Sequence, residues 1–186
     1  MNQIVNAFFQ LSSERLQYLV DEFGFRRGPK RPEGGLYRVL YEGEKAAVEI
    51  GLEWKEQYVY VELFRLINGK IQENPIIIQP NSELTVHNLE DLIGIRAPGM
   101  MLGPEYFSKR LTVDSLDHVL TYYSRALREL GGDVLQGDFA VFCELESIVK
   151  ARISPAVSAD DRAPVTRPTT LSKKHSMKLS GRSQVR

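Results

Sequence analysis

Three side chains in the sequence have the chemistry of catalytic residues: Cys143, His87 and His118. A cysteine and a histidine form a nucleophilic pair only within hydrogen-bonding reach, which spacing along the chain does not establish. Cys143 stands between Phe142 and Leu145 in a run with helical spacing, so we interpret it as a small core residue. His118 falls in the first turns of a predicted helix, which is typical of an exposed or partly packed side chain. We predict no catalytic residue, and these observations argue against an enzyme.

A glycine- and proline-rich stretch, IGIRAPGMMLG at 93–103, comes nearest to a ligand-binding loop. No GKS or GKT follows it and no strand precedes it in dinucleotide-fold spacing, so a phosphate loop is not predicted. Arg96 beside Met100 and Met101 would instead form an adaptable contact surface. The loop over 96–107 is long, and loops of such length often have a role. A small-ligand-binding protein or an enzyme that uses this loop is therefore an alternative.

A pair of carboxylates gives a more specific signal. In VEIGLEWKEQYVYVELFRL at 48–66, apolar and polar residues alternate, and a two-residue turn at 55–56 places Glu49 opposite Glu62. Like charges directly opposite each other cost a few tenths to about 1 kcal/mol. We predict that Arg38 on the preceding strand pairs with Glu49, which gives an Arg–Glu–Glu ladder on a solvated face. No histidine or third ligand accompanies the pair, so neither a metal site nor a cofactor is predicted.

Aromatic residues share the predicted sheet face that carries these carboxylates. Tyrosine and phenylalanine make this face more apolar than a bare outer surface requires, and tyrosine is enriched in protein interfaces. Carboxylates beside tyrosines suit a basic partner surface. We predict a partner-binding surface made by this face and the 96–107 loop: Arg38, Glu49, Glu53, Tyr58, Tyr60, Glu62, Phe64, Arg96, Met100 and Met101. As an alternative, the aromatic residues would form the interface of a structural homodimer.

Segments that alternate with period two are predicted to build the sheet: 36–42, 46–54 and 57–67. Two-residue turns between them give a register in which Val39 faces Val48. One face is then uniformly apolar and should pack on helices: Tyr37, Val39, Tyr41, Val48, Ile50, Leu52, Val59, Val61 and Leu63. The Asn-Gly pair at 68–69 predicts a further hairpin. That hairpin would return the chain as strands over 70–73 and 75–80.

Helices are predicted on either side of these strands in the sequence. Apolar spacing indicates one kinked helix or two short ones before Gly24, followed by a loop that contains four cations. Later helices are predicted over three ranges with caps from Asn88, Asp114 and Asp138: 86–95, 115–130 and 139–153. Grouped strands with flanking helices predict an α+β fold, an antiparallel meander of three to five strands packed on one face by helices.

The charge of the chain is unevenly distributed. Residues 1–150 hold 16 Lys and Arg against 22 Asp and Glu, whereas residues 151–186 hold 8 against 2. The segment after Ile153 has no Phe, Trp or Tyr and is rich in Ser, Pro and Thr, so its burial cannot offset its ordering entropy. We predict a single α+β domain over 1–153 and a disordered basic tail over 154–186. The sparse charges of the tail, without stacking aromatics, argue against nucleic-acid recognition.

Neither a signal peptide nor a membrane span is predicted. The N-terminal run MNQIVNAFFQLSSERL lacks a basic start followed by an unbroken apolar stretch. No segment approaches the roughly 20 apolar residues that a membrane helix needs. A single cysteine cannot form an intrachain disulfide, which suits a reducing compartment. We therefore expect a cytoplasmic protein.

Two segments carry a resemblance to a known group of proteins. NGK at 68–70 and GDFAVFCELESIVKAR at 137–152, behind an N-terminal helix and tyrosine-rich strands, resemble small bacterial α+β proteins that include immunity proteins of toxin systems. The resemblance spans about residues 10–153. It implies a non-enzymatic protein that binds and blocks a toxin domain, often with an acidic surface against a basic nuclease. The expected partner is therefore a basic toxin domain, and the acidic body of the chain agrees with this expectation.

Overall fold

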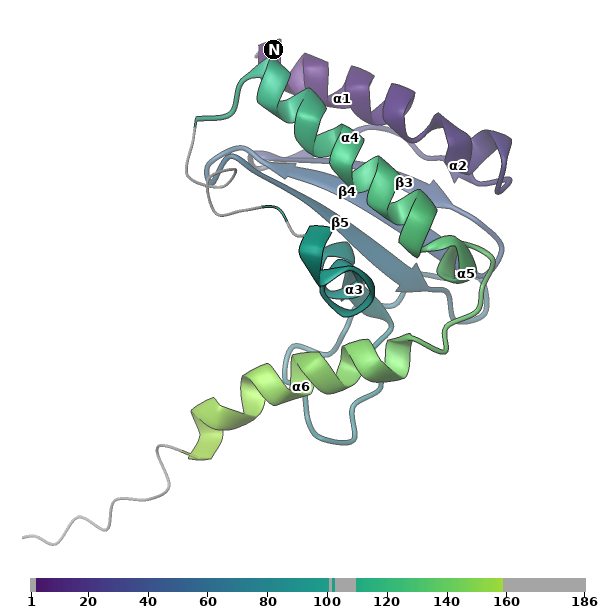
Figure 1. The fold of residues 1–186 in the computed structure, drawn as a ribbon, viewed down its shortest axis with the longest axis vertical. Helices are drawn as coiled ribbons and strands as arrows, with labels where there is room; N and C mark the ends of the chain where they lie inside the picture. The colour runs from purple at the N-terminus through teal and green to yellow at the C-terminus, as the bar shows by residue number, and fades with distance from the viewer. Residues whose placement is uncertain (1–2, 101, 103–109, 159–186) are drawn as a thin grey trace, which may run out of the picture.

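The computed structural model describes residues 3–100, 102 and 110–158, which form a six-stranded antiparallel sheet with helices packed against it (Figure 1). The predicted α+β fold is confirmed. The elements in chain order are α1 (Gln3–Arg15), α2 (Gln17–Asp21), β1 (Arg26–Arg27), β2 (Arg31–Glu33), β3 (Leu36–Glu42), β4 (Ala46–Glu53), β5 (Tyr58–Arg65), β6 (Val86–Asn88), α3 (Leu89–Arg96), the 3-10 turn η1 (Pro98–Met100), α4 (Val113–Leu130), α5 (Gly132–Leu135) and α6 (Phe142–Ser158).

The strand order is β1–β3–β4–β5–β6, and β2 also pairs with β3. The predicted pairing of β4 with β5 is confirmed, because Glu49 lies opposite Glu62 and Ile50 lies opposite Val61. Side chains alternate between the two faces of a strand, so this one register decides which residues reach the core.

The pairing of β3 with β4 differs from the prediction by two residues. Val39 faces Ile50 rather than Val48. The turn between the strands is longer than two residues, and the Gly43 amide donates to the carbonyl of Ala46 at 2.8 Å. A shift of two residues keeps every side chain on its predicted face, so the division into an apolar and a polar face survives the error.

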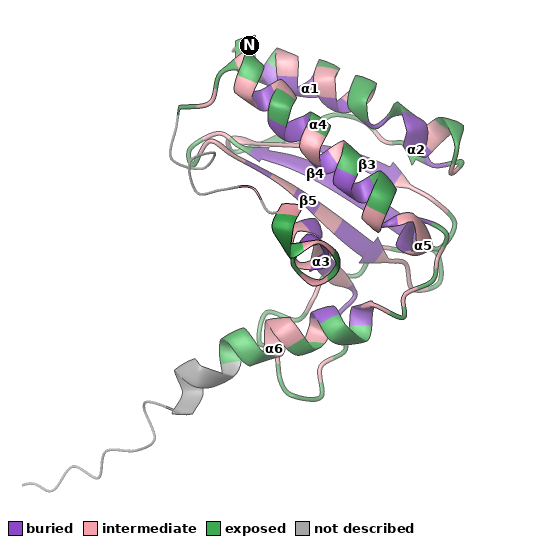
Figure 2. Ribbon diagram, in the orientation of Figure 1, coloured by how far each residue is buried: buried purple, intermediate pink, exposed green. Residues whose placement is uncertain are grey.

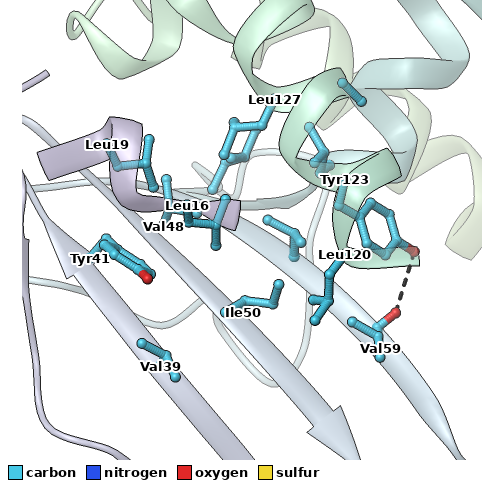
Figure 3. Close-up of a cluster of buried hydrophobic side chains, with 14 of the residues drawn as sticks. Leu16, Leu19, Val39, Tyr41, Val48, Ile50, Val59, Leu120, Tyr123 and Leu127 are labelled. Carbon is cyan, nitrogen blue, oxygen red and sulfur yellow. Dashed lines mark hydrogen bonds between the residues drawn. The ribbon is translucent and has the colours of Figure 1, made fainter. Parts of the chain in front are cut away.

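The apolar face of the sheet, here called the inner face, packs against α1, α4 and α5 (Figure 1). Helix α4 contributes a buried stripe that includes Leu116, Leu120, Tyr123 and Leu127. Figure 3 shows part of this stripe above Ile50 on the strands. Full burial of a large aliphatic side chain contributes about 1.5–3 kcal/mol, so this layer supplies most of the cohesion of the domain.

Tyr123 also closes an open part of the sheet edge. Strand β6 pairs with β5 only over Glu62–Phe64. Beyond β6, the Tyr123 hydroxyl lies 3.3 Å from the carbonyl oxygen of Val59 (dashed in Figure 3) and donates to the carboxylate of Glu90 on α3. The hydroxyl of Tyr58 donates to the same carboxylate at 3.2 Å. Side chains from two helices thus occupy a place where the sheet has no strand.

The region after β5 differs from its prediction. The turn at 68–69 forms, with φ angles of 54° and 71°, and Ile67 bridges to Lys70. The predicted strands over 70–73 and 75–80 do not form, and the chain runs through an irregular segment to β6. Prolines at both ends of the second segment remove the amide donors that a strand would need. The edge position belongs to β6, where a helix was predicted to begin.

The caps of the helices follow the prediction in part. Asn88 caps α3 as predicted and accepts from the backbone of the first turn. Helix α4 is capped by Thr112, which forms a capping box with Ser115, so the prediction of Asp114 as the cap was wrong. Asp138 accepts a hydrogen bond from the Ala140 amide, but α6 begins only at Phe142. A threonine cap two residues earlier lengthens α4 by that much.

Two further boundaries differ from the prediction. The cationic segment predicted as a loop contributes β1 and β2, which pair with β3 and are exposed. Helix α6 continues to Ser158, beyond the predicted end of that helix at 153. The rest of the predicted tail, 159–186, lies outside the described residues. Within the described ranges, none of the helices has the length and apolarity to cross a membrane.

The Tyr123 hydroxyl gives a test of this packing. We expect Tyr123→Phe to lower the free energy of unfolding by roughly 1–3 kcal/mol, because it leaves a buried backbone carbonyl and a carboxylate with one donor fewer. Chemical denaturation followed by circular dichroism measures this change. Tyr37→Phe is the matched control, because Tyr37 is only partly buried against the core. Equal stability of the two variants would contradict the proposed contribution of Tyr123.

Candidate functional site

The polar face of the sheet, here called the outer face, is hollowed into a pocket of about 510 Å³, the outer-face pocket. Four carboxylates line it: Glu42, Glu49, Glu62 and Glu73. Two guanidinium groups line it as well: Arg31 and Arg38. Strands β3, β4 and β5 position three of the carboxylates by their alternation, whereas Glu73 comes from the irregular segment after β5. Negative groups therefore outnumber positive groups around the pocket.

The floor of the outer-face pocket is apolar. Leu40 and Phe64 are only 2% and 6% exposed, and Ile71 and Val86 pack against them. Strand β4 is consequently buried at seven of its eight positions. Figure 2 shows this central strand in the colour of buried residues. The prediction of a solvated outer face was therefore wrong in part. The segment after β5 folds over this face and covers Phe64, which was predicted to be a contact residue.

Glu49 is the most enclosed carboxylate of the pocket, with 7% of its surface exposed. Its contacts are long: the Tyr60 hydroxyl donates to it at 3.4 Å, and the Arg38 guanidinium is 3.8 Å away. Arg38 donates at 2.5 Å to Glu33 instead. Arg38 lies opposite Gly51 in the sheet, so its predicted position opposite Glu49 was wrong. The predicted ion pair between the two residues forms as a longer, diagonal contact.

The protonation equilibria of the pocket reflect this arrangement. Burial raises the pKa of Glu49 above its usual 4.5, although the Arg38 guanidinium partly opposes the shift. Burial also raises the pKa of Glu62, and the charge of Glu49 raises it further. Both shifts have the same physical meaning: the folded protein holds these two carboxylates in their charged form at a cost.

Tyr60 packs over Gly51 on the neighbouring strand, beside the carboxylates. A Cβ atom at Gly51 would lie 2.1 Å from the Cζ atom of Tyr60, so the tyrosine ring occupies the space that a side chain would fill. Tyr58 stacks on the same ring, with 6.4 Å between ring centroids and 21° between the planes. Burial raises the pKa of Tyr58 to about 12, with Glu90 adding to the shift. Both hydroxyls thus remain neutral donors at physiological pH.

The structure separates the predicted contact residues into two groups. Those of β3, β4 and β5 share the outer face, and Glu53 lies opposite Tyr58 at the far end of that face. Arg96 instead binds Asp133 at 2.5 Å on the helical side of the molecule. Met100 packs partly buried against the main core, and Met101 lies outside the described residues. The loop and the outer face therefore do not form one surface among these residues.

His87 and Cys143, two of the residues with catalytic chemistry, differ in burial. His87 is 2% exposed and packs edge-on against Phe142 at 4.5 Å between ring centroids. Burial lowers its pKa below the usual 6.5, with the backbone of Leu84 partly opposing the shift. Cys143 is exposed, so its interpretation as a core residue was wrong: α6 turns Phe142 inward and the next residue outward. In the described part of the chain, no group of three or more His, Cys, Asp or Glu side chains is arranged to hold a metal ion.

Three charged residues of the pocket were not predicted as site residues: Arg31, Glu42 and Glu73. Glu42 follows Leu40 by two positions on β3, so strict alternation alone was enough to place it on the outer face. Arg31 was noted only as one of several loop cations, and its position along β3 depends on the short strand β2. Glu73 reaches the pocket through a segment without secondary structure, which no periodicity in the sequence indicates.

A glutamine at position 62 tests the electrostatic cost of the carboxylate pair. We expect Glu62→Gln to raise the free energy of unfolding at neutral pH by a few tenths to about 1 kcal/mol. The pKa of Glu62 is higher in the folded protein than its usual 4.5. The stability that the protonated carboxyl group gives the folded state is therefore lost as pH rises from 4.5 through the folded-state pKa. The advantage of the variant should therefore grow from about pH 4.5 towards neutrality. Urea denaturation at several pH values measures it.

The control for this measurement is Glu56→Gln, which makes the same charge change at an exposed turn position. Comparison of two variants also cancels the opposite pH dependence from His87. A destabilised Glu62→Gln protein at neutral pH, or a pH-independent effect equal to that of the control, would contradict the cost assigned to the pair.

Gly51→Ala tests whether the Tyr60 ring packs over Gly51. The new methyl group would displace the ring of Tyr60, so we expect the nuclear Overhauser contacts between that ring and residue 51 to disappear and the Tyr60 ring shifts to change. Gly94→Ala is the control, since a Cβ there meets no atom within 4 Å outside its own helix. An unchanged Tyr60 spectrum in the Gly51 variant would show that the ring does not lie over this glycine in solution.

No protein-family model matches the chain, and comparison with curated proteins and with solved structures finds no match. The resemblance to immunity proteins therefore stays a prediction. What the outer-face pocket does has to be argued from its geometry and electrostatics.

Proposed function

We propose that the protein is a non-enzymatic binding protein whose outer sheet face recognises a basic surface of a protein partner. An inhibitor or an immunity protein that covers a basic toxin domain is the form of this function that the sequence resemblance suggests. The proposal concerns the outer face only, because Arg96 and Met100 lie elsewhere.

One observation carries the proposal: Glu49 and Glu62 stand directly opposite each other in an open pocket, and no described residue forms a short ion pair with either. Such a pair opposes folding in the free protein, since burial and mutual repulsion both disfavour the two charges. A cationic group from a partner would make the electrostatic energy of these two carboxylates favourable. A pair that is unfavourable alone and favourable in a complex is what a recognition site for positive charge requires.

The surroundings of the pair support a protein as the partner. Tyr58 and Tyr60 lie half-buried beside it and are held in a stacked arrangement before any partner arrives. A rigid tyrosine loses little conformational entropy on binding and offers both apolar area and a hydroxyl. The excess of acidic residues over 1–150 would also steer a basic protein towards this body at low salt.

The two alternative functions stay predictions. An enzyme or ligand site at 96–107 rests largely on residues outside the described ranges. A homodimer through the aromatic residues would use Phe64, which the protein already buries itself. Neither alternative has a geometric observation that favours it over the basic partner.

Affinity capture tests the proposal. We expect immobilised full-length protein, incubated with a lysate of its source and then cross-linked, to retain a basic protein. About 500 mM salt during the incubation should reduce the retention strongly. Triple replacement of Glu49, Glu53 and Glu62 by Gln should abolish the retention. Calorimetry with the purified partner then measures the affinity, and co-expression shows whether the protein suppresses the partner's activity or toxicity.

The matched control changes the same charge on the helical side: Glu14→Gln, Asp114→Asn and Glu129→Gln. These positions are exposed on α1 and α4 and should leave the capture unchanged. If the control triple abolished capture and the outer-face triple did not, the interface would lie on the helices and the proposed function of the outer face would be wrong.

A further inference from the structure

We propose that the outer-face pocket receives a single arginine side chain, with its guanidinium between Glu49 and Glu62 and its methylene groups along Leu40 and Phe64. This inference rests on the proposed function and names the chemistry by which the partner is recognised. It also makes a prediction of its own, because a pocket for one side chain should bind a small molecule that carries only that side chain.

The first support is the incomplete set of donors around Glu49. A carboxylate has about four acceptor positions. Among the described residues, Glu49 receives one long hydrogen bond, 3.4 Å from the Tyr60 hydroxyl, and the Arg38 guanidinium lies 3.8 Å away. Arg38 is held away by its short bond to Glu33. A buried carboxylate that lines a pocket with such long contacts has room for one further charged donor.

The second support is the arrangement of apolar and charged walls. Leu40 and Phe64 form a small buried cluster, with Ile71 packed against it, directly beside the two carboxylates. A long side chain with an apolar stem and a cationic head places each part against matching atoms. A free inorganic cation would leave the apolar wall unused. The volume of about 510 Å³ lies in the range of ligand pockets and does not require the protein to open.

The third support separates arginine from lysine. Glu49 and Glu62 project from neighbouring strands, so a guest between them faces two carboxylates at once. The planar guanidinium donates through several N–H groups in fixed directions and is less strongly hydrated than an ammonium group. It can therefore bond to both carboxylates with a smaller desolvation cost. Arginine is also among the residues that dominate interface energetics.

The test is a nuclear magnetic resonance titration of the 15N-labelled full-length protein with N-acetyl-arginine N-methylamide. The neutral isostere of the probe, the citrulline derivative, and the lysine derivative are titrated in parallel. We expect saturable shifts of the amides of Glu49, Gly51 and Glu62 with a dissociation constant on the order of 1–10 mM. The citrulline and lysine probes should each bind at least about fivefold more weakly.

Variants localise the effect. Glu49→Gln combined with Glu62→Gln should remove the arginine response, and because Gln relieves the repulsion the variant should remain folded, as its own spectrum shows. Glu44→Gln combined with Glu56→Gln makes the same charge change at exposed positions between the strands, outside the pocket, and should keep the response. Equal binding of citrulline, equal binding of lysine, or loss of the response in the control pair would each overturn the inference.

The outcome is distinguishable from that of the capture experiment. If a basic partner is captured through the outer face but the arginine probe shifts no pocket amide, the function stands and the pocket assignment is wrong. If the probe binds as expected but the outer-face triple does not affect capture, the pocket prefers arginine as inferred and the proposed function of the surface is wrong.

Discussion

The structure depends on one constraint, which is the burial of the inner face of β4 and β5 beneath α1 and α4. Ile50 and its neighbours point into the core in a register that places them opposite Val61 and its neighbours. In this register the alternation of the strands places Glu49 opposite Glu62 on the other face. The like-charged pair is therefore a consequence of the register that holds the domain together. Burial of several large apolar side chains outweighs a local repulsion of about 1 kcal/mol.

This coupling explains how a costly site can persist. The repulsion is small beside the free energy of the core, so the fold tolerates it without a compensating short ion pair from the described part of the chain. Arg38 shares its charge between Glu33 and the pocket instead of neutralising the pocket fully. Tyr60 can lie over the sheet only because Gly51 has no side chain. The outer face thus combines a fixed scaffold with polar groups whose bonding capacity is left unused.

The strands and the inner face were predictable because burial imposes a strong period-two pattern on β3, β4 and β5. The β4–β5 register followed from the turn at 55–56, whereas the turn after β3 has two more residues and moved Val39 from Val48 to Ile50. The cover over Phe64 was not predictable, because the segment that contributes Ile71 and Glu73 has no regular structure. Arg96 and Met100 were assigned to the site by residue type alone, and tertiary contacts placed them on the helical side.

The short β6 strand leaves part of the β5 edge without a neighbouring strand among the described residues. An exposed edge of this kind offers its carbonyl and amide groups to the edge of another molecule. At Val59 the phenolic group of Tyr123 already occupies the carbonyl, and α3 lies alongside through Glu90. A hydroxyl in this position cannot propagate a backbone ladder, so it terminates the sheet. The same tyrosine that anchors α4 therefore also protects the molecule from strand-to-strand polymerisation at this edge.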